Sequence, residues 1–495
     1  MNYVLAHDLG TSGNKVTLFD ENGALVAEAT VNYPTNYFNS NWAEQNPNDW
    51  WASVCAGTRS ALQNIDPRQV SVVSFSGHMM GALCVDRKGV PLRPSIIWSD
   101  QRAQKEFLGL QRELGEEKIF RITGHRGSGN YSLPKLMWVK NNEPDIYAKT
   151  YKTLHCKEYI ISKLTGRFFS EPTDGIGTLA MDITSCAWSD EILLASGVAK
   201  DKFPDVLKSV DIAGKVTREA AAATGLAEGT PVVMGGGDGV VAGIGTGAVA
   251  LGDSFMSFGS SAWVSTVSTG PAFDSKRRNT NWPHIVDGLY LNDGVMQSAG
   301  GSYTWARKAL SEHEPDNHGE MEKLLAETKP GANGILFLPY LLGERCPWWN
   351  PDAKGAFVGL TMETTKAEML RAVLEGVAHN MAYIADVLRG NGLPLRDIVV
   401  IGGGARGTLW REILADAMDA TIHIPTLLEG ATSLGAAITG GVGIGIYPDF
   451  TTAAKKFITI KDIHRPNAER TAFYRERRKL FVDCYEAMEP LFSKF

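Results

Sequence analysis

Short apolar runs separated by glycine-rich turns set the pattern of the N-terminal region. Residues 3–6 and 16–19 are apolar and flank a polar loop over residues 8–15, which is typical of two strands joined by a tight connection. Residues 20–23 form a hairpin turn signal, and a further strand pattern follows over residues 24–31. The pattern predicts a meander of strands with the polar loop at one end.

An apolar run that ends in glycines returns further along the chain. Residues 231–247 and 398–405 each predict a strand, a glycine turn and the start of a helix, and an amphipathic helix follows over residues 409–418. Residues 257–264 repeat the first loop, with a glycine and two hydroxyl residues between apolar runs. Further strands are predicted over residues 70–75, 82–85 and 96–102, and further helices from Asn46, over 104–164 and over 470–492. Strands alternating with helices predict an α/β protein.

The chain divides into two similar halves in this interpretation. With 495 residues it is too long for one ordinary core. The two loops that combine glycine with hydroxyl residues lie one domain apart, which predicts that each half presents one loop to a shared nucleotide. We place the boundary near residue 248, with domains over residues 1–248 and 249–495.

Composition and charge exclude several classes of function. The chain is 44% hydrophobic and 21% charged and contains 52 glycines, and its formal net charge is −6 without a basic block, so no nucleic-acid partner is expected. Its six cysteines include no Cys-x-x-Cys pair, which argues against a zinc site and a disulfide framework. The charge-free run between Glu429 and Asp449 contains six glycines and predicts a buried helix and loop instead of a membrane span. Because a strand begins almost at the N-terminus, leaving no room for a signal peptide, we expect a cytoplasmic protein.

The polar loop over residues 8–15 has the residue types of a phosphate-binding loop. Its two glycines free the backbone to point N–H groups at an anion, while hydroxyl residues and Lys15 add donors and a cation. Asp8 would repel a phosphate unless a divalent cation such as Mg²⁺ lies between them. The alternative is a hairpin with a glycine-rich turn and a surface aspartate.

Asp238 follows three glycines at the end of a predicted strand and opens the next helix. A carboxylate at this position could accept the proton of a substrate hydroxyl. The alternative is a helix N-cap, an ordinary role of aspartate at the start of a helix. The residues alone leave both roles open.

Taken together, these stretches resemble the FGGY carbohydrate kinases, a family of the actin-like ATPase superfamily. The most specific match is Gly-Glu-Arg-Cys-Pro at 343–347, which continues through 355–360 to Glu375 in the manner of the family's C-terminal signature. The N-terminal signature matches at Lys135 and Trp138 and departs from the usual pattern at Asn130. The segments 8–15, 235–239, 257–262 and 402–408 are similar, in that order, to the first phosphate motif, the catalytic-aspartate segment, the second phosphate motif and the adenosine motif.

The resemblance implies two actin-like (ribonuclease H-like) domains with a nucleotide cleft between them, and the use of ATP and Mg²⁺. Asp238 is the implied catalytic base and, together with Asp8, an implied ligand of Mg²⁺. For Gly300 and Thr304 a helix face of small packing residues stays open as the alternative, and for Lys15 a solvated strand lysine. The implied ATP-binding residues are Thr11, Ser12, Gly13, Lys15, Ser260, Gly300, Thr304, Gly403, Gly404 and Thr408.

The implied acceptor is a ketopentose, D-xylulose or a related pentulose, phosphorylated on a terminal hydroxyl. The runs at 8–13 and 97–100 are similar to those of family members that phosphorylate xylulose. Such members usually have Gln-Met-His where this chain has residues 78–80, and Asp-Asn where it has residues 238–239. Another acceptor (gluconate, erythritol, erythrulose or another polyol) is the alternative, and a non-enzymatic actin-like nucleotide-binding protein is the remote one. The implied acceptor-binding residues are His78, Met79, Met80, Asp100 and Asp238.

Structural roles are predicted for most remaining aromatic residues and histidines. Trp98 is the exception, because it lies next to Ser99 and Asp100. His155 and the histidines between residues 313 and 318 show no metal-ligand spacing and are predicted to lie on the surface. FGGY enzymes often form dimers, so a homodimer is expected. Packing in a core or an interface is predicted for Trp50, Trp51, Trp138, Trp188 and Trp410.

Overall fold

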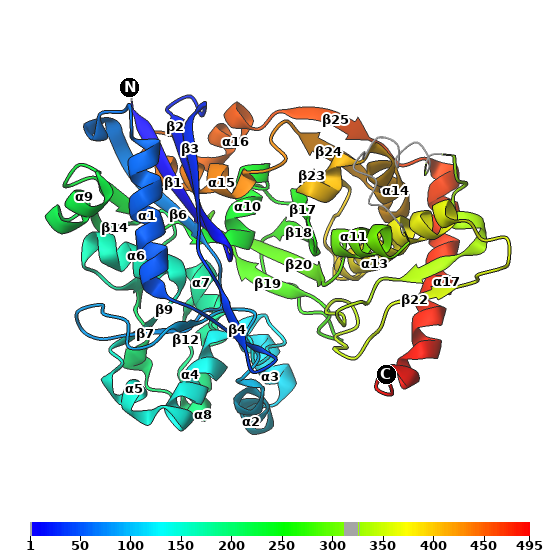
Figure 1. Ribbon diagram of the computed structural model, residues 1–495, viewed down its shortest axis with the longest axis horizontal. Helices are drawn as coiled ribbons and strands as arrows, with labels where there is room; N and C mark the ends of the chain where they lie inside the picture. Colours follow the sequence, from blue (N-terminus) through cyan, green and yellow to red (C-terminus); the bar gives the residue numbers. More distant parts are fainter. Residues whose placement is uncertain (1, 311–324, 326) are drawn as a thin grey trace.

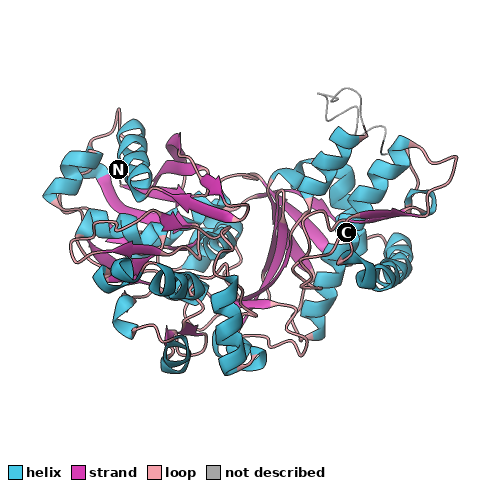
Figure 2. Ribbon diagram, turned by 60° about the horizontal axis from the view of Figure 1, so that its bottom comes forward, coloured by secondary structure: helices cyan, strands magenta, loops and turns pink. Residues whose placement is uncertain are grey.

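Two seven-stranded sheets, one in each half of the chain, organise the structure. The structure is a computed structural model, and it describes residues 2–310, 325 and 327–495. The two halves form two lobes that lie side by side, with the N-terminus on the first lobe and the C-terminus on the second (Figure 1). Helices flank the strands of each lobe (Figure 2). The α/β architecture predicted from the alternating pattern is therefore confirmed.

The first sheet has the order β14-β15-β6-β1-β2-β3, and a short strand, β16, also pairs with β6. The first three strands form an antiparallel meander, while β6 runs parallel to β1, and β15 runs parallel to β6. The strands are β1 (Tyr3–Leu9), β2 (Gly13–Asp20), β3 (Leu25–Asn32), β6 (Val70–Gly77), β14 (Ile212–Lys215), β15 (Pro231–Val233) and β16 (Gly236–Gly237).

The second sheet has the order β19-β20-β18-β17-β23-β24-β25. Its core resembles that of the first: β17, β18 and β20 are antiparallel neighbours, β23 and β24 run parallel to β17, and β19 is added at the edge beside β20. The strands are β17 (Ser254–Phe258), β18 (Ala262–Ser268), β19 (Thr280–Pro283), β20 (Tyr290–Met296), β23 (Asp397–Ile401), β24 (Thr421–Pro425) and β25 (Ile460–His464). The first and second glycine–hydroxyl loops thus occupy equivalent places in the two lobes.

Helices and short two- or three-stranded sheets complete both lobes. In the first lobe the helices are α1 (Pro47–Ala61), α2 (Gln104–Leu114), α3 (Glu116–Thr123), α4 (Ser132–Asn142), α5 (Pro144–Lys149), α6 (Cys156–Thr165), α7 (Pro172–Gly177), α8 (Asp190–Ser196), α9 (Arg218–Thr224) and α10 (Asp238–Thr246). In the second half they are α11 (Gly300–Ala309), α13 (Lys366–Gly390), α14 (Thr408–Met418), α15 (Ala431–Gly443), α16 (Phe450–Phe457) and α17 (Ala468–Phe492). The short sheets are β4 (Asn36–Phe38) with β5 (Trp42–Gln45) and β8 (Ser95–Ile96); β7 (Leu83–Val85) with β9 (Lys152–Leu154); β10 (Phe169–Ser170) with β13 (Asp205–Val206); β11 (Met181–Asp182) with β12 (Ala187–Trp188); and β21 (Leu336–Leu338) with β22 (Ala356–Val358).

One predicted strand is much shorter than expected. The apolar pattern predicts a strand over residues 96–102, but β8 ends at Ile96. The chain turns there because the N–H of Asp100 donates to the carbonyl oxygen of Ile97, and the same carbonyl accepts a hydrogen bond from the Lys135 ammonium group at 2.8 Å. The polar segment from Trp98 to Asp100 is therefore a turn at the edge of the candidate site.

The two lobes share a core in which helices α10 and α15 pack closely against each other. The predicted domain boundary, residue 248, falls between α10 and β17. Helix α15, which comes from the second half of the chain, nevertheless packs on β1 and β6 of the first sheet. A Cβ atom at Gly245 would overlap the carbonyl oxygen of Ala431, and one at Gly435 would overlap the carbonyl oxygen of Val241. Only glycine allows the two helix backbones to approach this closely.

Gly435→Ala is expected to destabilise the protein, because the added methyl group must push α10 and α15 apart. Overpacking of this kind costs about 1–3 kcal/mol. Thermal and urea unfolding of the purified variant measure the change. The matched control is Gly109→Ala in helix α2, where a Cβ atom meets nothing within 4 Å and the better helix propensity of alanine is expected to leave stability unchanged or higher. Equal stability of the two variants would contradict the close crossing.

Candidate active site

Two carboxylates lie at the carboxyl ends of the two strands that flank β6 in the first sheet. Asp8 is near the end of β1 and pairs in register with Ser76 of β6, and Gly237 of β16 pairs with Gly77 on the other side of β6. Asp238 follows directly, as the first residue of α10. Both side chains are half-buried. The topology therefore brings two acidic groups, 230 positions apart in the numbering, to one edge of the sheet.

The electrostatics of these carboxylates reflect their burial and their proximity. The pKa of Asp238 is raised to about 7, mainly by burial and then by the charge of Asp8, against a hydrogen bond with the N–H of Gly239 that lowers it. Burial also raises the pKa of Asp8 to about 6, against hydrogen bonding with Ser76 and the charge of Lys15. A carboxylate with a pKa near neutrality is suited to exchange a proton at physiological pH.

The loop between β1 and β2 presents backbone N–H groups next to Asp8. The N–H of Gly10 donates to the carbonyl oxygen of Gly13 at 2.9 Å, which closes the loop. In the part of the chain that the structure describes, the N–H groups of Thr11 and Ser12 donate no hydrogen bond. Lys15 lies in β2, 3.3 Å from Glu28. The two open N–H groups fit an anion such as a phosphate.

The loop between β17 and β18 has the same construction. The N–H of Gly259 donates to the carbonyl oxygen of Ser261 at 2.9 Å, and α11 begins against this loop because Gly300 and Gly301 donate to Gly259 and Ser260. A Cβ atom at Gly300 would lie 2.5 Å from the carbonyl oxygen of Gly259. Gly300 therefore packs closely against the loop, as the alternative prediction for it proposed. It also lines the cavity described next.

A cavity of about 520 Å³ opens in the second lobe between α11, α13 and the start of α14. Its volume lies within the usual range for ligand sites. Of the predicted ATP-binding residues it brings together Ser260, Gly300, Thr304, Gly403 and Gly404, while Thr408 begins α14 directly after the lining residue Gly407. The lining residues not predicted are Gly259, Tyr303, Arg307, Leu325, Leu374, Arg406, Gly407, Leu409, Trp410 and Glu429.

Trp410 combines the packing role predicted for it with a place in the cavity wall. Its ring lies 4.5 Å from the ring of Phe258, and its indole N–H donates to the carbonyl oxygen of Leu374 at 3.1 Å. The prediction from the sequence treated Trp410 as packing alone, because periodicity places a residue on a buried helix face without showing what lies beyond that face.

The predicted acceptor residues 78–80 continue from the end of β6 beside Asp238. A Cβ atom at Gly237 would overlap the Met79 thioether, so Met79 packs directly on the residue before Asp238. His78 is buried, and within the described residues neither of its ring nitrogens has a hydrogen-bond partner. Burial lowers its pKa to about 3, so the ring is neutral. Met80 has a left-handed backbone with φ of 62°.

Asp100, also predicted to bind the acceptor, has a different environment. Its side chain is fully buried, and its Oδ2 accepts hydrogen bonds from the N–H of Ala43 at 2.6 Å and from Arg102 at 2.7 Å. Its Oδ1 accepts from the N–H of Arg102 at 2.9 Å. Because both oxygens are engaged, the geometry favours a structural ion pair over a sugar ligand for Asp100.

Lys135 ties the loops around the acceptor side together. Its buried ammonium group donates to the carbonyl oxygens of Met80 and Ile97 at 2.8 Å each and of Asn130 at 2.5 Å. Trp98, on the same side, donates from its indole nitrogen to the Thr11 hydroxyl at 2.8 Å. The sequence indicated Lys135 only as part of a family signature. Its hydrogen bonds to three carbonyl groups could not be predicted, because these groups belong to separate loops.

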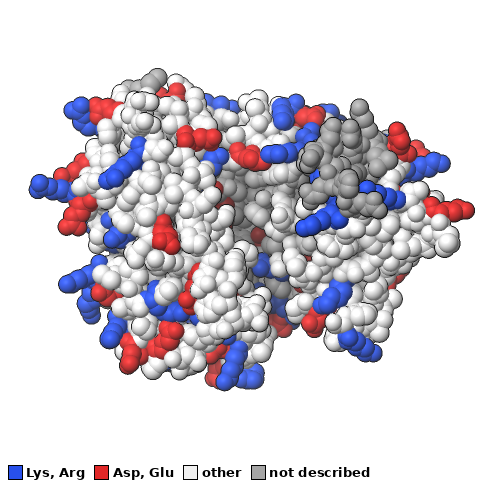
Figure 3. Space-filling view, in the orientation of Figure 1, with Lys and Arg blue, Asp and Glu red and all other residues white. Residues whose placement is uncertain are grey.

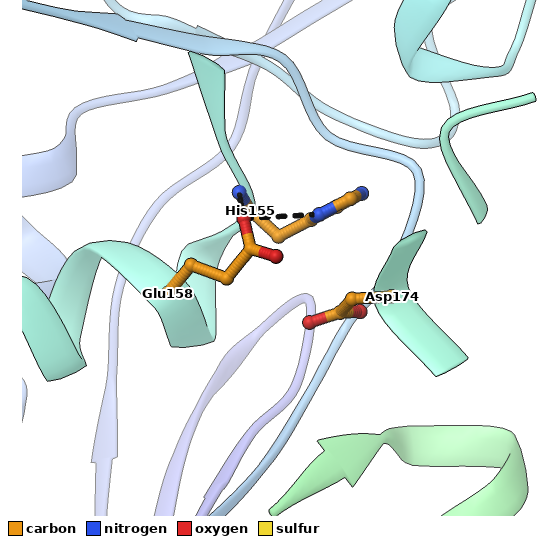
Figure 4. Close-up of side chains that lie close together, drawn as sticks. All are labelled: His155, Glu158 and Asp174. Carbon is orange, nitrogen blue, oxygen red and sulfur yellow. Dashed lines mark hydrogen bonds and ion pairs between the residues drawn. The ribbon is translucent and has the colours of Figure 1, made fainter. Parts of the chain in front are cut away.

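A buried polar network lies behind residues 78–80, and it corrects the prediction for His155. His155 is buried and not on the surface: its Nδ1 lies 3.3 Å from Glu158, at the start of α6, and Asp174 of α7 lies close by (Figure 4). The ammonium group of Lys157 lies 3.1 Å from Asp174 and 3.3 Å from Glu171. This buried ammonium group supplies the positive charge that the acidic cluster requires. The histidines between 313 and 318 lie outside the described residues.

The face shown in Figure 3 is hollowed along its middle, between the two lobes. Positive and negative side chains are scattered over this face without forming a continuous basic band (Figure 3). Among the described helices, none combines the length and the apolar character that crossing a membrane requires.

Two α/β lobes built on similar sheets, each with a glycine–hydroxyl loop between its first two strands, have the architecture of the actin-like ATPase class of proteins. Comparison with known families then gives the family itself. The chain belongs to the FGGY family of carbohydrate kinases: the N-terminal domain of the family matches residues 3–245 and the C-terminal domain matches residues 255–444. It is therefore an ATP-using phosphotransferase with an alcohol group as acceptor.

Full-length similarity to individual proteins agrees with this family. The chain is 32% identical to the xylulose kinase of Escherichia coli K12 over 98% of its own length and 99% of the relative. It is 30% identical to the gluconokinase of Bacillus licheniformis over 99% of its length and 97% of the relative. The crystal structure of ligand-bound xylulose kinase from Lactobacillus acidophilus matches with a TM-score of 0.94 and 26% identity over 100% of both chains.

Proposed function

We propose that this carbohydrate kinase transfers the γ-phosphate of Mg·ATP to a terminal hydroxyl of a ketopentose, D-xylulose or a related pentulose. The observation that carries the proposal is that Asp8 and Asp238 lie at the ends of the two strands that flank β6, beside a loop with open N–H groups. The similarity to xylulose kinases over the full chain supports this choice of acceptor.

In the proposed mechanism Asp238 accepts the proton of the attacking hydroxyl. Its pKa of about 7 keeps a substantial fraction ionised at neutral pH while leaving it basic enough to take a proton during transfer. The open N–H groups of Thr11 and Ser12 hold phosphate oxygens from one lobe, and Ser260 approaches from the other. Positioning and charge stabilisation of this kind carry most of the catalysis in phosphoryl transfer.

The two carboxylates also fit a Mg²⁺ ion. Mg²⁺ prefers oxygen ligands and keeps several of its waters, and carboxylates whose pKa values are raised by burial and mutual repulsion regain their ionised forms next to a cation. Asp8 and Asp238 would hold the ion, directly or through water. The ion would supply charge neutralisation on the phosphates.

The nucleotide part of the proposal assigns adenosine to the cavity lined by Gly403 and Gly404. Gly403→Val is expected to weaken ADP binding by about tenfold or more, because nothing lies within 4 Å of its Cβ position and the new side chain would project into the cavity. Calorimetric titration with ADP measures the change. Gly270→Val, at a half-buried position outside the cavity with nothing within 4 Å of its Cβ position, is the control that should bind ADP normally. Unchanged ADP affinity in Gly403→Val would place adenosine elsewhere.

Gluconate is the second candidate acceptor, because a gluconokinase is about as similar to this chain as the xylulose kinases are. Residues 78–80 also depart from the usual sequence of xylulose-phosphorylating members, and two methionines make this wall less polar. An acceptor oriented differently from xylulose would suit such a wall.

ADP release from Mg·ATP across a panel of pentuloses, tetruloses, polyols and gluconate tests the acceptor. A clear preference for xylulose or another pentulose would support the proposal, whereas a preference for gluconate would support the second candidate. If no acceptor raised ADP release above background, the proposed reaction would be overturned. Repeating the panel with His78→Gln/Met80→His shows whether these positions set selectivity, in which case xylulose turnover should rise.

The proposal includes two domains, 1–248 and 249–495, that close on both substrates to exclude water, and a cytoplasmic homodimer. Closure of hinged lobes limits wasteful hydrolysis of ATP in such enzymes. Size-exclusion chromatography with light scattering tests the dimer: a mass of twice 53.7 kDa is expected, and a monomeric mass would contradict it.

A further inference from the structure

A second pocket, of about 280 Å³, lies in the second lobe at the far ends of the helices that line the nucleotide cavity. It is formed where the last turns of α13 and α14 meet the first turns of α17. The residues that line it are Asp386, Arg389, Leu395, Arg396, Ala417, Asp419, Thr471, Arg475 and Arg478. None of these residues belongs to the candidate active site.

Positive charge exceeds negative charge in this pocket. Four guanidinium groups face two carboxylates, which leaves two positive charges uncompensated. Arg478 lies 2.7 Å from Asp386, and Arg475 lies 3.0 Å from Asp419. Within the described chain Arg396 has no ion-pair partner. Burial, together with the charges of Arg389 and Arg475, lowers the pKa of Arg478, which shows how closely the guanidinium groups gather.

Helix ends explain only some of these arginines. Arg389 donates to the carbonyl oxygens of Leu395 and Met418 at 2.6 and 2.7 Å, and Arg478 donates to that of Ala417 at 2.8 Å, so both satisfy carbonyl groups that end a helix or follow one. Arg396 and Arg475 have no such role among the described residues.

The pocket also contains an unsatisfied polar group. The hydroxyl oxygen of Thr471 is buried and, in the described part of the chain, has no hydrogen-bond partner. A buried hydroxyl group without a partner is unfavourable, so a ligand oxygen that accepts its hydrogen would be stabilised. Together with the surplus of guanidinium groups, the hydroxyl points to a ligand that is anionic and rich in oxygen acceptors.

We propose that this pocket is a binding site for a small phosphate monoester. Guanidinium groups recognise phosphate oxygens through paired N–H donors, and two surplus positive charges match the charge of a phosphate dianion. A volume of about 280 Å³ accommodates a phosphate group with a short carbon chain or a single sugar. The proposed reaction makes a phosphorylated sugar, so its own product belongs to this class of ligand.

The position of the pocket links it to nucleotide binding. Helix α14 begins at the cavity wall beside Gly407 and ends at Ala417 and Asp419 in the pocket, a length of about 16 Å. Helix α13 likewise contributes Leu374 to the cavity and Asp386 to the pocket. Because the same two rigid helices border both sites, an occupied pocket is expected to change the affinity for ADP, and ADP to change the affinity of the pocket by the same factor.

Calorimetric titration with glycerol 3-phosphate, with ADP saturating the active site and ionic strength constant, tests the site. Saturable binding is expected in the wild type, with at least a tenfold loss in Arg396→Ala/Arg475→Ala. Lys479→Ala, which removes an exposed charge from α17 outside the pocket, should bind normally. Absence of saturable binding, or equal binding by the double variant, would overturn the proposal.

Inorganic phosphate and the phosphorylated product serve as further probes in the same titration. Equal affinity for inorganic phosphate would identify the phosphate group alone as the ligand, whereas tighter binding of the product that is lost in Arg396→Ala/Arg475→Ala would show that the pocket also contacts the organic part. Both results support the site. The measurement does not depend on turnover, so failure of the pocket and failure of the proposed reaction can be told apart by assaying the same preparation for kinase activity.

Discussion

Asp238→Asn is expected to lower the rate of sugar phosphorylation by about 100- to 10,000-fold, the usual contribution of a positioned general base. The amide has nearly the size of the carboxylate and can still accept a hydrogen bond at the start of α10, but it cannot take the proton of the hydroxyl. Steady-state release of ADP with the best acceptor measures the loss. Binding of ADP and the circular dichroism spectrum should be unchanged, and near-normal turnover would contradict the assignment of the base.

The raised pKa of Asp238 gives this prediction a second, independent readout. Activity at low acceptor concentration should rise with pH to a plateau, because only the ionised form accepts a proton, and its midpoint should lie below about 7, because bound Mg²⁺ favours the ionised form. Since the folded-state pKa lies above 3.8, the folded protein retains a proton that the unfolded chain releases, and stability falls as the pH rises from about 4 through 7. Asp238→Asn removes that loss and should raise the free energy of unfolding at pH 8 by on the order of 1 kcal/mol.

Lys157→Met is expected to destabilise the first lobe by about 3–5 kcal/mol, because it leaves a buried carboxylate without its cation. Asp174 depends on Lys157 most, since neither of its oxygens has a hydrogen-bond partner among the described residues. Glu171 is better satisfied, with hydrogen bonds from Thr173 and Ser209. Unfolding by urea, followed by tryptophan fluorescence, measures the loss.

The charge origin of this effect can be separated from the loss of packing. Burial raises the pKa of Asp174 to about 6, and Lys157 opposes this shift, so without the lysine the carboxyl group will hold its proton to higher pH. The variant should therefore be less destabilised at pH 5.5 than at pH 8, and Asp174→Asn should restore part of its stability. Lys163→Met, at an exposed position of the same helix, is the control. A loss independent of pH and of Asp174 would contradict a charge effect.

Local patterns were sufficient to predict the α/β architecture, and the family resemblance added several residues that line the cavity. The loop over residues 8–15 and the glycine turn before Asp238 both follow directly on an apolar run. A glycine-rich interruption of an apolar run can be recognised in the sequence alone. The boundaries of β3, α14 and α17 agree with the predicted segments within two residues. The strand predicted over residues 96–102 was wrong beyond Ile96. Lys135 of helix α4 donates a hydrogen bond to this segment, which forms a turn.

The features that the sequence did not predict depend on contacts between distant segments. His155 was predicted to lie on the surface because its acidic neighbour Asp174 comes from another helix, 19 positions later. The hydrogen bond that Asp100, a predicted sugar ligand, accepts from the N–H of Ala43 was not predicted either, because Ala43 lies 57 positions earlier in the chain. The arginine pocket likewise gathers residues from α13, α14 and α17, which lie far apart in the sequence.

The close crossing of α10 and α15 constrains how this enzyme can be recombined with its relatives. Exchanging whole halves at residue 248 is an obvious way to combine the acceptor-binding half of one relative with the nucleotide-binding half of another. Such a chimera would join α10 from one parent to α15 from the other, at a contact where no side chain fits between Gly245 and Gly435. Designs that keep both helices, together with the segment that α15 packs on, from a single parent are therefore the ones expected to fold.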